Sequence, residues 1–250
     1  MSLEDGDLRG LRVLVVGASS GIGRAIATQL VEGGAKVAAA ARRVDRVQEI
    51  SNALAICCDV RDPQDCDRAV ADSVARLGGL DAVVYAAGIG PFTPLDVSGR
   101  EAWLEVLETN LIGPALITRA ALPHLTHDAK RGRALFLSSD AAERCYPGLV
   151  AYGASKAGLS RFCQGLQAEF PALRVSDVIV GPTGDTGVSD HMDPDLLGYW
   201  VERWYAEGWV RFAMQTSAEV AAVVIDTLRA REPATVIRAH GGPEVGARPL

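Results

Sequence analysis

Short apolar runs alternate with segments of helical periodicity along nearly the whole of this 250-residue chain. Such alternation is typical of repeated βα units, in which each helix crosses over to the next parallel strand. The apolar runs predict strands at Leu11–Val16, Lys36–Ala41, Leu54–Cys58, Asp81–Ala86, Arg133–Ser138, Arg174–Val180 and Ala234–Arg238. The segments between them predict helices at about 21–33, 43–51, 63–77, 100–123, 151–169 and 217–230. We therefore expect an α/β fold with a doubly wound, mostly parallel seven-stranded sheet and helices on both faces.

One domain, residues 1–250, is the simplest organisation, because no glycine- or serine-rich linker divides the chain. The connection at 181–214 interrupts the alternation, and Asp193-Pro194 and Gly208 predict the ends of a helix within it. Six of the fourteen aromatic residues lie in 199–212, and so long a connection is usually functional. We expect a substrate lid at about 183–214. The alternative, that this helix buries its aromatic side chains against the core or a neighbouring subunit, stays open.

Composition and charge exclude several classes of partner. The net charge is −6 and no dense block of lysine and arginine occurs, so a nucleic-acid surface is not expected. No apolar run is long enough to cross a bilayer, and the first residues are acidic where a signal peptide would be basic. The five cysteines form no C-x-x-C pair and the four histidines have no metal-ligand spacing. We expect a cytoplasmic protein with reduced thiols, without a metal and without a membrane partner.

A glycine-rich segment follows the first predicted strand and opens the first predicted helix. It reads Gly17-Ala-Ser-Ser-Gly21-Ile-Gly23. Glycines permit a tight turn and let the backbone approach a pyrophosphate, which the N–H groups of the helix terminus then bind. The alternative is a tight turn with no ligand. The position of the glycines between strand and helix favours the interpretation as a dinucleotide site on a Rossmann-type fold.

The end of the second predicted strand indicates which dinucleotide is bound. An acidic residue there would bind the ribose 2′-hydroxyl of NAD, but this chain has Ala41 followed by Arg42 and Arg43. Two arginines suit a 2′-phosphate, so we expect NADP, with NAD as the alternative. Asp59, which follows the third predicted strand, could contact the adenine or could fix the turn.

Three side chains could act together in proton transfer. Tyr152 and Lys156 are four residues apart near the start of a predicted helix, so they share one face of it. Ser139 follows the fifth predicted strand, at the edge of a parallel sheet where ligands bind. A free tyrosine titrates near pH ~10, and a neighbouring ammonium together with a nicotinamide cation would lower that pKa. We therefore expect Tyr152 to act as a general acid or base toward a carbonyl or alcohol.

From about residue 10 to 246 the chain resembles the short-chain dehydrogenase/reductase family, in its branch of about 250 residues. The matching residues are Gly17-x-x-x-Gly21-Ile-Gly23, Asp59-Val60, Ala87-Gly88, Thr109-Asn110, Ser138-Ser139, Tyr152-x-x-x-Lys156, Thr186 and Gly241-Gly242. The resemblance implies that Ser139 orients the carbonyl, that Tyr152 transfers the proton, and that Lys156 holds the nicotinamide ribose. It also implies that Asn110 holds a water that feeds protons to the lysine.

Taken together, the patterns and the resemblance predict a set of cofactor contacts. These are Gly17, Ser19, Ser20, Gly21, Ile22, Gly23, Arg42, Arg43, Asp59, Val60, Ala87, Gly88, Tyr152, Lys156 and Thr186. The chain departs from the family pattern at Val16, where a threonine is usual, and at Tyr85-Ala86, where two asparagines are usual. These losses fall on one contact between the first and fourth strands, and we expect apolar packing to replace it. A third departure, Gly181-Pro182 in place of Pro-Gly, affects the loop that contains Thr186.

The expected activity is an NADP-preferring oxidoreduction of a small carbonyl compound or alcohol by hydride transfer. Large aromatic side chains in the lid indicate an apolar or ring-containing substrate. We expect substrate contacts from Ser139, Cys145, Leu149, Tyr152, Trp200 and Trp204. The alternative function is a catalytically silent NADP-sensing or partner-binding module on the same fold. The resemblance also implies a homo-oligomer, a tetramer or a dimer, with Leu159, Phe162 and Leu166 available for the contact.

Overall fold

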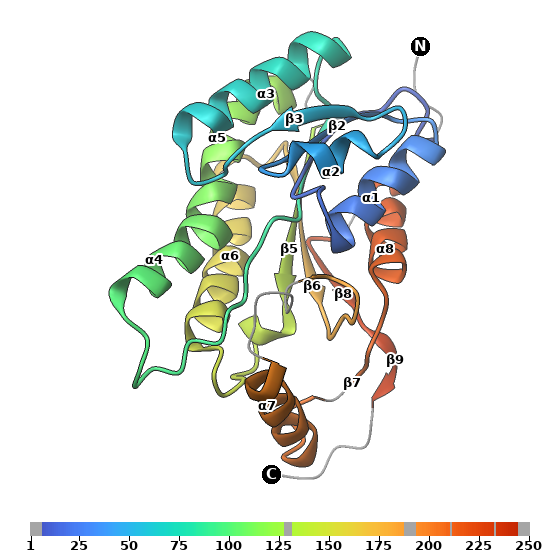
Figure 1. Cartoon of the computed structure of the whole chain (residues 1–250). Helices are drawn as coiled ribbons and strands as arrows, with labels where there is room; N and C mark the ends of the chain where they lie inside the picture. The colour runs from blue at the N-terminus through green and yellow to red at the C-terminus, as the bar shows by residue number, and fades with distance from the viewer. Residues whose placement is uncertain (1–6, 128–131, 188–193, 211, 233, 245–250) are drawn as a thin grey trace.

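A parallel sheet of seven strands forms the centre of the molecule (Figure 1). The computed structural model describes residues 7–127, 132–187, 194–210, 212–232 and 234–244. The strands are β1 (Arg12–Val16), β2 (Lys36–Ala41), β3 (Leu54–Cys57), β4 (Ala82–Tyr85), β5 (Arg133–Ser139), β6 (Arg174–Val180) and β8 (Val236–Ala239). Their order is β3-β2-β1-β4-β5-β6-β8, and every neighbouring pair is parallel. The predicted α/β fold class is confirmed.

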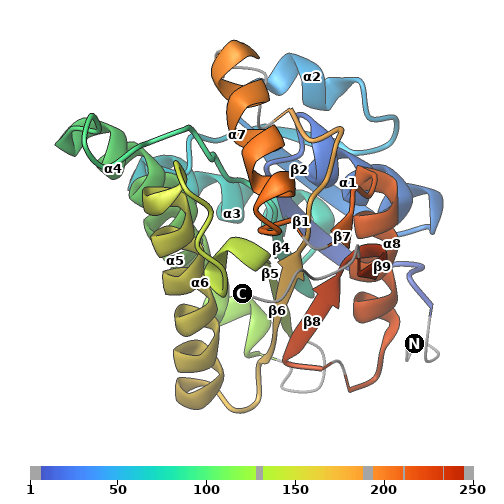
Figure 2. The ribbon, with the colours of Figure 1, turned by 90° about the horizontal axis from the view of Figure 1, so that it is seen from below.

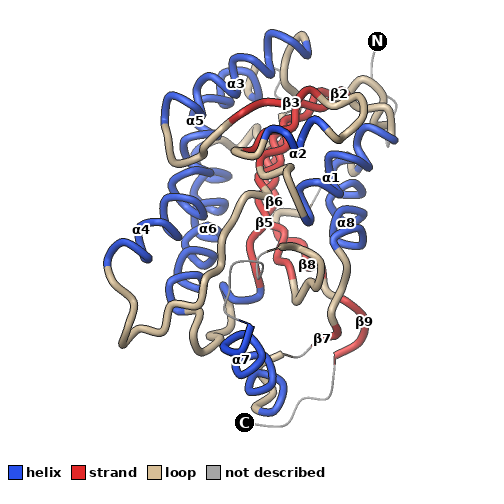
Figure 3. The backbone as a smooth tube through the Cα atoms, in the orientation of Figure 1, coloured by secondary structure: helices blue, strands red, loops and turns tan. Residues whose placement is uncertain are grey.

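Helices cover both faces of the sheet (Figure 3). One face is covered by α1 (Gly21–Glu32), α2 (Val44–Gln48) and α8 (Ser217–Arg229). The other is covered by α3 (Pro63–Leu77), α5 (Gly113–Leu125) and α6 (Val150–Glu169), with α4 (Arg100–Leu107) beside α6. Successive strand residues alternate between the two cores, so that Val15 packs under α1 and α8 while Leu14 packs under α3. This arrangement explains why the strands read as continuous apolar runs.

The strand order has its topological switch point beside β1. The strands that follow β1 along the chain lie on one side of it up to β3, and those from β4 onward lie on the other. In open α/β sheets, ligands bind outside the carboxyl ends of the strands at such a switch point. The glycine segment, Ala87-Gly88 and Ser139 all follow or end these central strands. The fold therefore brings the predicted cofactor and catalytic residues to one edge.

The predicted helix at 100–123 is wrong as a single helix. It is divided into α4 and α5 by a π-helical turn, η1 (Glu108–Ile112), and Pro123 lies inside α5, which continues to Leu125. The Tyr85 hydroxyl donates to the Thr109 carbonyl at 2.7 Å, so a side chain from β4 satisfies a backbone group of this wider turn. Gly113 is required next to it, because a Cβ there would lie 2.5 Å from the Tyr85 oxygen.

The C-terminal third contains elements beyond the carboxyl edge of the sheet. Helix α7 (Pro194–Ala206) lies there, as Figure 2 shows from below. A short antiparallel pair, β7 (Phe212–Ala213) and β9 (Gly241–Glu244), was not anticipated from the sequence. In the part of the chain that the structure describes, no helix combines the length and apolarity that crossing a membrane requires.

One expectation about subunit contacts is wrong. Leu159 and Leu166 are only 1% and 6% exposed and pack in the core beneath α6. Phe162 packs against that same core and makes an edge-to-face contact with Phe136 of β5, with ring centroids 5.5 Å apart. The helical period directs all three toward the sheet, so they belong to the core of the subunit and do not form an external contact surface.

Candidate active site

The glycine loop between β1 and α1 is shaped by close backbone contacts. Gly17 has a φ of 92°, and a Cβ there would lie 2.5 Å from the Ala87 nitrogen. The loop is fixed to β2 by hydrogen bonds from the Gly17 and Ala18 N–H groups to the Ala40 carbonyl. Side chains larger than glycine would therefore separate the loop from the segment that follows β4.

The start of α1 has the properties of an anion-binding terminus. Its N-cap, Ser20, is extended and its side chain makes no capping hydrogen bond, and the first turn contains no acidic residue. The N–H groups of this turn are thus left for another acceptor, at the positive end of the helix dipole. Ile22 packs against the core below, which fixes the helix to the sheet. A dinucleotide pyrophosphate fits this arrangement.

Arginine side chains lie where the ribose of a dinucleotide is expected. Arg43 donates from Nη2 to the hydroxyls of Ser19 and Ser20, at 3.3 and 3.1 Å. It therefore joins the end of β2 to the glycine loop. Arg42 is exposed and acts electrostatically on Asp59, helping to lower the pKa of that carboxyl.

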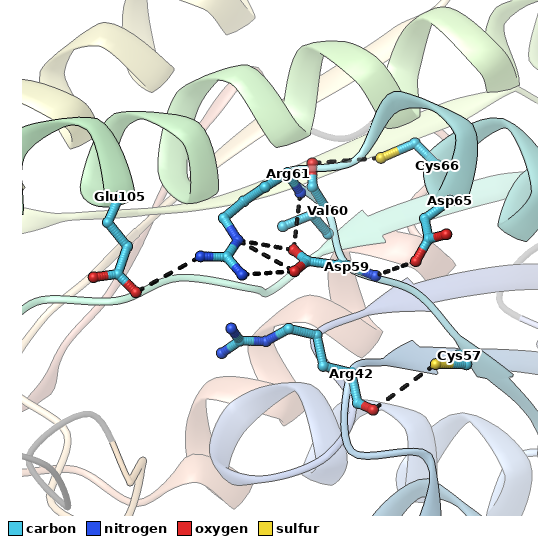
Figure 4. A network of polar contacts seen from close by, with 8 residues as sticks. All are labelled: Arg42, Cys57, Asp59, Val60, Arg61, Asp65, Cys66 and Glu105. Carbon is cyan, nitrogen blue, oxygen red and sulfur yellow. Dashed lines mark hydrogen bonds and ion pairs between the residues drawn. The ribbon is translucent and has the colours of Figure 1, made fainter. Parts of the chain in front are cut away.

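Asp59 fixes the turn after β3, as one of the two sequence interpretations predicts. Its carboxylate accepts from the backbone and the guanidinium of Arg61, with a shortest distance of 2.7 Å (Figure 4). The hydrogen bonds from the Arg61 guanidinium are the main reason that the pKa of Asp59 is lowered. The Asp59 N–H donates to Asp65, and the Val60 carbonyl accepts from the Cys66 thiol. Contact of Asp59 or Val60 with an adenine stays a prediction.

The loop after β6 closes over the glycine loop. A Cβ on Gly21 would lie 2.5 Å from the Thr186 carbonyl oxygen, and Gly21 itself has a φ of 53°. The Thr186 backbone is thus placed beside the start of α1 despite the altered Gly181-Pro182 sequence. This is the side on which the resemblance predicts that Thr186 holds the cofactor.

Ser139 and Tyr152 come together at the carboxyl edge. Ser139 is the last residue of β5, and Tyr152 lies in the first turn of α6. Burial raises the pKa of Tyr152 to about 12, a hydrogen bond from the Ser139 hydroxyl offsets part of that rise, and the charge of Asp140 adds to it. The two hydroxyls therefore face one another, as the sequence predicts.

Lys156 is buried beside the ring of Tyr152. It is 5% exposed, its Nζ donates to the Leu137 carbonyl at 2.8 Å, and it lies 5.7 Å from the centroid of the Tyr152 ring. Burial lowers the pKa of Lys156 to about 8, although the charge of Asp177 opposes this. In the protein by itself, burial is the main cause of the raised pKa of Tyr152. The lowering of this pKa by the ammonium together with a nicotinamide cation stays a prediction.

Asn110 occupies the π-helical turn and is completely buried. Its side chain makes two hydrogen bonds with the backbone of Ile89, at 2.9 and 2.8 Å, and donates to the Ser155 hydroxyl at 3.0 Å. Gly88 lies between Asn110 and Lys156, because a Cβ there would be 3.4 Å from the Asn110 oxygen and 3.3 Å from the Lys156 Nζ. Asn110 and Lys156 therefore flank Gly88, and Lys156 also approaches the ring of Tyr152, which is hydrogen-bonded to Ser139.

Aromatic side chains from α7 and from the loop before α6 pack around Tyr152. Leu149, Tyr152 and Trp204 pack in one cluster with Tyr146. Trp204 contacts Tyr146 edge to face, with centroids 5.3 Å apart, and its Nε1 donates to the Pro147 carbonyl at 3.0 Å. Cys145 is exposed and is not a member of this cluster, so its contact with substrate stays a prediction.

Trp200 packs on residues from two other segments. It stacks on Phe92 with ring centroids 6.4 Å apart, and Gly148 lies beneath both rings. Gly148 has a φ of 86°, and its Cβ would lie 3.1 Å from the Trp200 ring and 3.3 Å from Phe92. Helix α7 therefore rests on the loops that flank Ser139 and Tyr152. Both aromatic residues that the sequence singles out here point into this contact.

Sequence reasoning missed several side chains around the site. Phe92 packs against α7, and Asp140 and Tyr146 form a buried polar pair beside Ser139. The only signals for them were a charged residue directly after Ser139 and a tyrosine within the predicted substrate wall. Tyr85 was expected as part of an apolar replacement, whereas its hydroxyl is hydrogen-bonded to the turn that holds Asn110.

The fold and site define a dinucleotide-binding α/β protein with a tyrosine–lysine pair. A family model described as "short chain dehydrogenase" matches residues 12–196. The chain is 36% identical over 176 residues to 11-beta-hydroxysteroid dehydrogenase 1A of Arabidopsis thaliana, which covers 65% of this chain and 49% of that one. It is 34% identical to an NADP-dependent 3-hydroxy acid dehydrogenase of Salmonella typhi, which covers 71% and 74%.

A solved structure agrees over a larger share of the chain. An alcohol dehydrogenase from the archaeon Thermococcus sibiricus, complexed with 5-hydroxy-NADP, matches with a TM-score of 0.80 and 25% identity. The match covers 95% of this chain and 98% of that one. The chain spans about half the length of the plant relatives that it matches, between 49% and 53%. The chain belongs to the short-chain dehydrogenase/reductase family.

Proposed function

We propose that this protein is an oxidoreductase that interconverts a carbonyl compound and an alcohol, with NADP as the preferred dinucleotide. The observation that supports it most is a chain of neighbours: Ser139 is hydrogen-bonded to Tyr152, Lys156 approaches the Tyr152 ring, and Asn110 and Lys156 flank Gly88. A module that only sensed a dinucleotide would need the glycine loop, but it would not need a proton-transfer group next to it.

The residues have separate roles in this proposal. Ser139 orients the substrate oxygen, and Tyr152 donates a proton to that oxygen in reduction or removes one in oxidation. Lys156 and Thr186 hold the nicotinamide end of the dinucleotide. Asn110 holds a water that passes protons to Lys156. The bound dinucleotide supplies or accepts the hydride. Burial holds the pKa of Tyr152 near 12 in the protein by itself, and the positive charge of a bound oxidised dinucleotide would lower it.

Positive charge near the end of β2 favours NADP. Arg42 and Arg43 follow Ala41, and Arg43 is already directed toward the glycine loop. The Asp59 carboxylate is paired with Arg61, so its negative charge is balanced and would repel a 2′-phosphate less. Two relatives, from Salmonella typhi and Haemophilus influenzae, are named as NADP-dependent dehydrogenases, which is consistent with this preference.

An apolar or ring-containing substrate fits the side of the site covered by α7. Leu149 and Trp204 pack in one cluster with Tyr152, and Trp200 stacks on Phe92 beside it. We infer that 183–214 is a lid, within one domain of residues 1–250, although the structure does not describe residues 188–193. Aromatic faces exclude water and would orient a flat carbonyl compound. The name of the plant relative, a hydroxysteroid dehydrogenase, is consistent with a substrate of this class.

A screen of ketones, aldehydes and alcohols with NADPH and NADP, following the absorbance of the reduced nicotinamide, tests the activity. Arg42→Ala and Arg43→Ala test the preference, and Arg46→Ala is a matched arginine in α2. We expect the first two variants to lose affinity for NADPH while affinity for NADH changes little, and the third to behave as wild type. Equal affinity of all variants for NADPH would refute the NADP assignment.

We also propose that the protein works in the cytoplasm as a homo-oligomer. Ile112 and Val150 are 46% and 43% exposed on the helical layer formed by α4 to α6, which leaves apolar surface for a second subunit. Sedimentation at several protein concentrations tests the oligomer. A single monomeric species at every concentration would refute it.

A further inference from the structure

A buried carboxylate lies directly beside the proposed catalytic hydroxyls. Asp140 opens the short 3-10 turn η2 (Asp140–Ala142) after β5 and is 7% exposed. Its Oδ2 accepts from the Tyr146 hydroxyl at 2.6 Å, and its Oδ1 accepts from the Ser139 hydroxyl at 3.2 Å. A buried acid is costly unless its oxygens are satisfied. Each oxygen of the buried Asp140 carboxylate therefore has its own hydroxyl partner.

The contacts of Ser139 make the direction of its hydroxyl depend on Asp140. A serine hydroxyl has one proton and two acceptor positions. The Ala141 N–H occupies one acceptor position at 3.2 Å, and the Asp140 carboxylate takes the proton. The Tyr152 oxygen is a further partner of Ser139, and the hydrogen bond between the two lowers the pKa of Tyr152. The single Ser139 proton can go to only one of these two oxygens, so an ionised Asp140 competes with Tyr152 for it.

We propose that Asp140 is a positioning residue, which, held by Tyr146, fixes the direction of the Ser139 hydroxyl and sets the charge that Tyr152 experiences as it transfers its proton. The inference rests on the proposed function and adds to it a side chain that assists the catalytic hydroxyls. Tyr146 also contacts Trp204 of α7 edge to face. Asp140 and Tyr146 therefore connect Ser139 to Trp204 of α7.

Charges around the pair act in consistent directions. Burial raises the pKa of Asp140, while the hydrogen bonds from Tyr146 and Ser139 and the nearby His240 and Arg144 lower it again in part. The charge of Asp140 in turn raises the pKa of Tyr152, whose other charged neighbour is Lys156. Removing the negative charge should make the phenol easier to ionise.

Three variants separate charge from position. Asp140→Asn keeps the shape and removes the charge, so we expect the titration of Tyr152 to move to lower pH by about 1 unit. Tyr146→Phe keeps the charge and removes the support of the carboxylate. We expect its Tyr152 titration near that of wild type, with turnover reduced on the order of 10-fold, the effect of one hydrogen bond to a charged group. Glu143→Gln removes an exposed carboxylate, paired with Arg238, from the same segment and is the control.

Two readouts follow these variants. One is the pH profile of kcat/KM for alcohol oxidation, and the other is carbon-13 NMR of labelled tyrosine, with the Tyr152 signal assigned through Tyr152→Phe. The NMR titration requires no turnover, so it tests the inference even if the proposed activity fails. A wild type that binds a dinucleotide but turns over no substrate would count against the proposed function alone. An unchanged Tyr152 titration in a folded Asp140→Asn protein, or an equal shift in Glu143→Gln, would overturn the inference.

Discussion

Replacement of Asn110 by alanine should destabilise the protein by an amount that the structure allows us to work out. The side chain is fully buried and makes three hydrogen bonds, two to the Ile89 backbone and one to the Ser155 hydroxyl. Each contributes about 1 kcal/mol net, and truncation also takes this partner away from the half-buried Ile89 backbone groups. We therefore expect a loss of about 3 kcal/mol in the free energy of unfolding. For a chain of this size that corresponds to roughly 9 °C in Tm.

The assay is equilibrium unfolding in urea, with thermal unfolding at one fixed protein concentration so that any oligomer contributes equally. Ser155→Ala is the matched variant, because it removes one of the three hydrogen bonds and keeps both contacts to Ile89, although it also loses the hydrogen bond from Ser155 to the Tyr152 carbonyl. We expect it to cost about 1–2 kcal/mol. A loss below about 1 kcal/mol for Asn110→Ala, or equal losses for both variants, would refute the view that Asn110 joins the π-helical turn to the segment after β4.

Two further predictions concern the ionisable pair and the lid. Because burial disfavours the charged amine, the pKa of Lys156 is about 8 and its charge is lost as the pH rises through that value. Pre-steady-state carbonyl reduction should therefore decline above about pH 8, and a flat profile up to pH ~10 would contradict this. Gly148→Ala introduces a Cβ 3.1 Å from the Trp200 ring at a positive φ. The substitution should lower the free energy of unfolding by about 1–2 kcal/mol. It should also change the tryptophan fluorescence and raise KM. An unchanged KM would show that Trp200 has no part in substrate binding.

The sequence predicted the sheet well because the strands are buried on both faces. Continuous apolar runs leave little doubt about their position, and the C-terminal ends of β1 and β5 then place Gly17 and Ser139 at one edge. The spacing of Tyr152 and Lys156 on α6 follows directly from helical geometry. These parts of the site depend on local structure and topology alone.

Other parts depend on long-range contacts that no local pattern contains. The π-helical turn at Asn110 is paired with the Tyr85 hydroxyl from β4, a contact between residues distant in sequence. The raised pKa of Tyr152 reflects the burial that results from packing, and the position of α7 depends on Phe92 and Gly148 meeting Trp200. The pair β7 and β9 is too short to give an alternating pattern.

The most direct test compares wild-type protein with Tyr152→Phe in the same two measurements. One is NADPH binding, followed by the fluorescence of the reduced nicotinamide, and the other is turnover of the best substrate from the screen. The proposal predicts that the variant binds NADPH with nearly the wild-type Kd and has lost essentially all turnover. Turnover that survives the loss of this single hydroxyl would contradict the assignment of Tyr152 as the proton-transfer group.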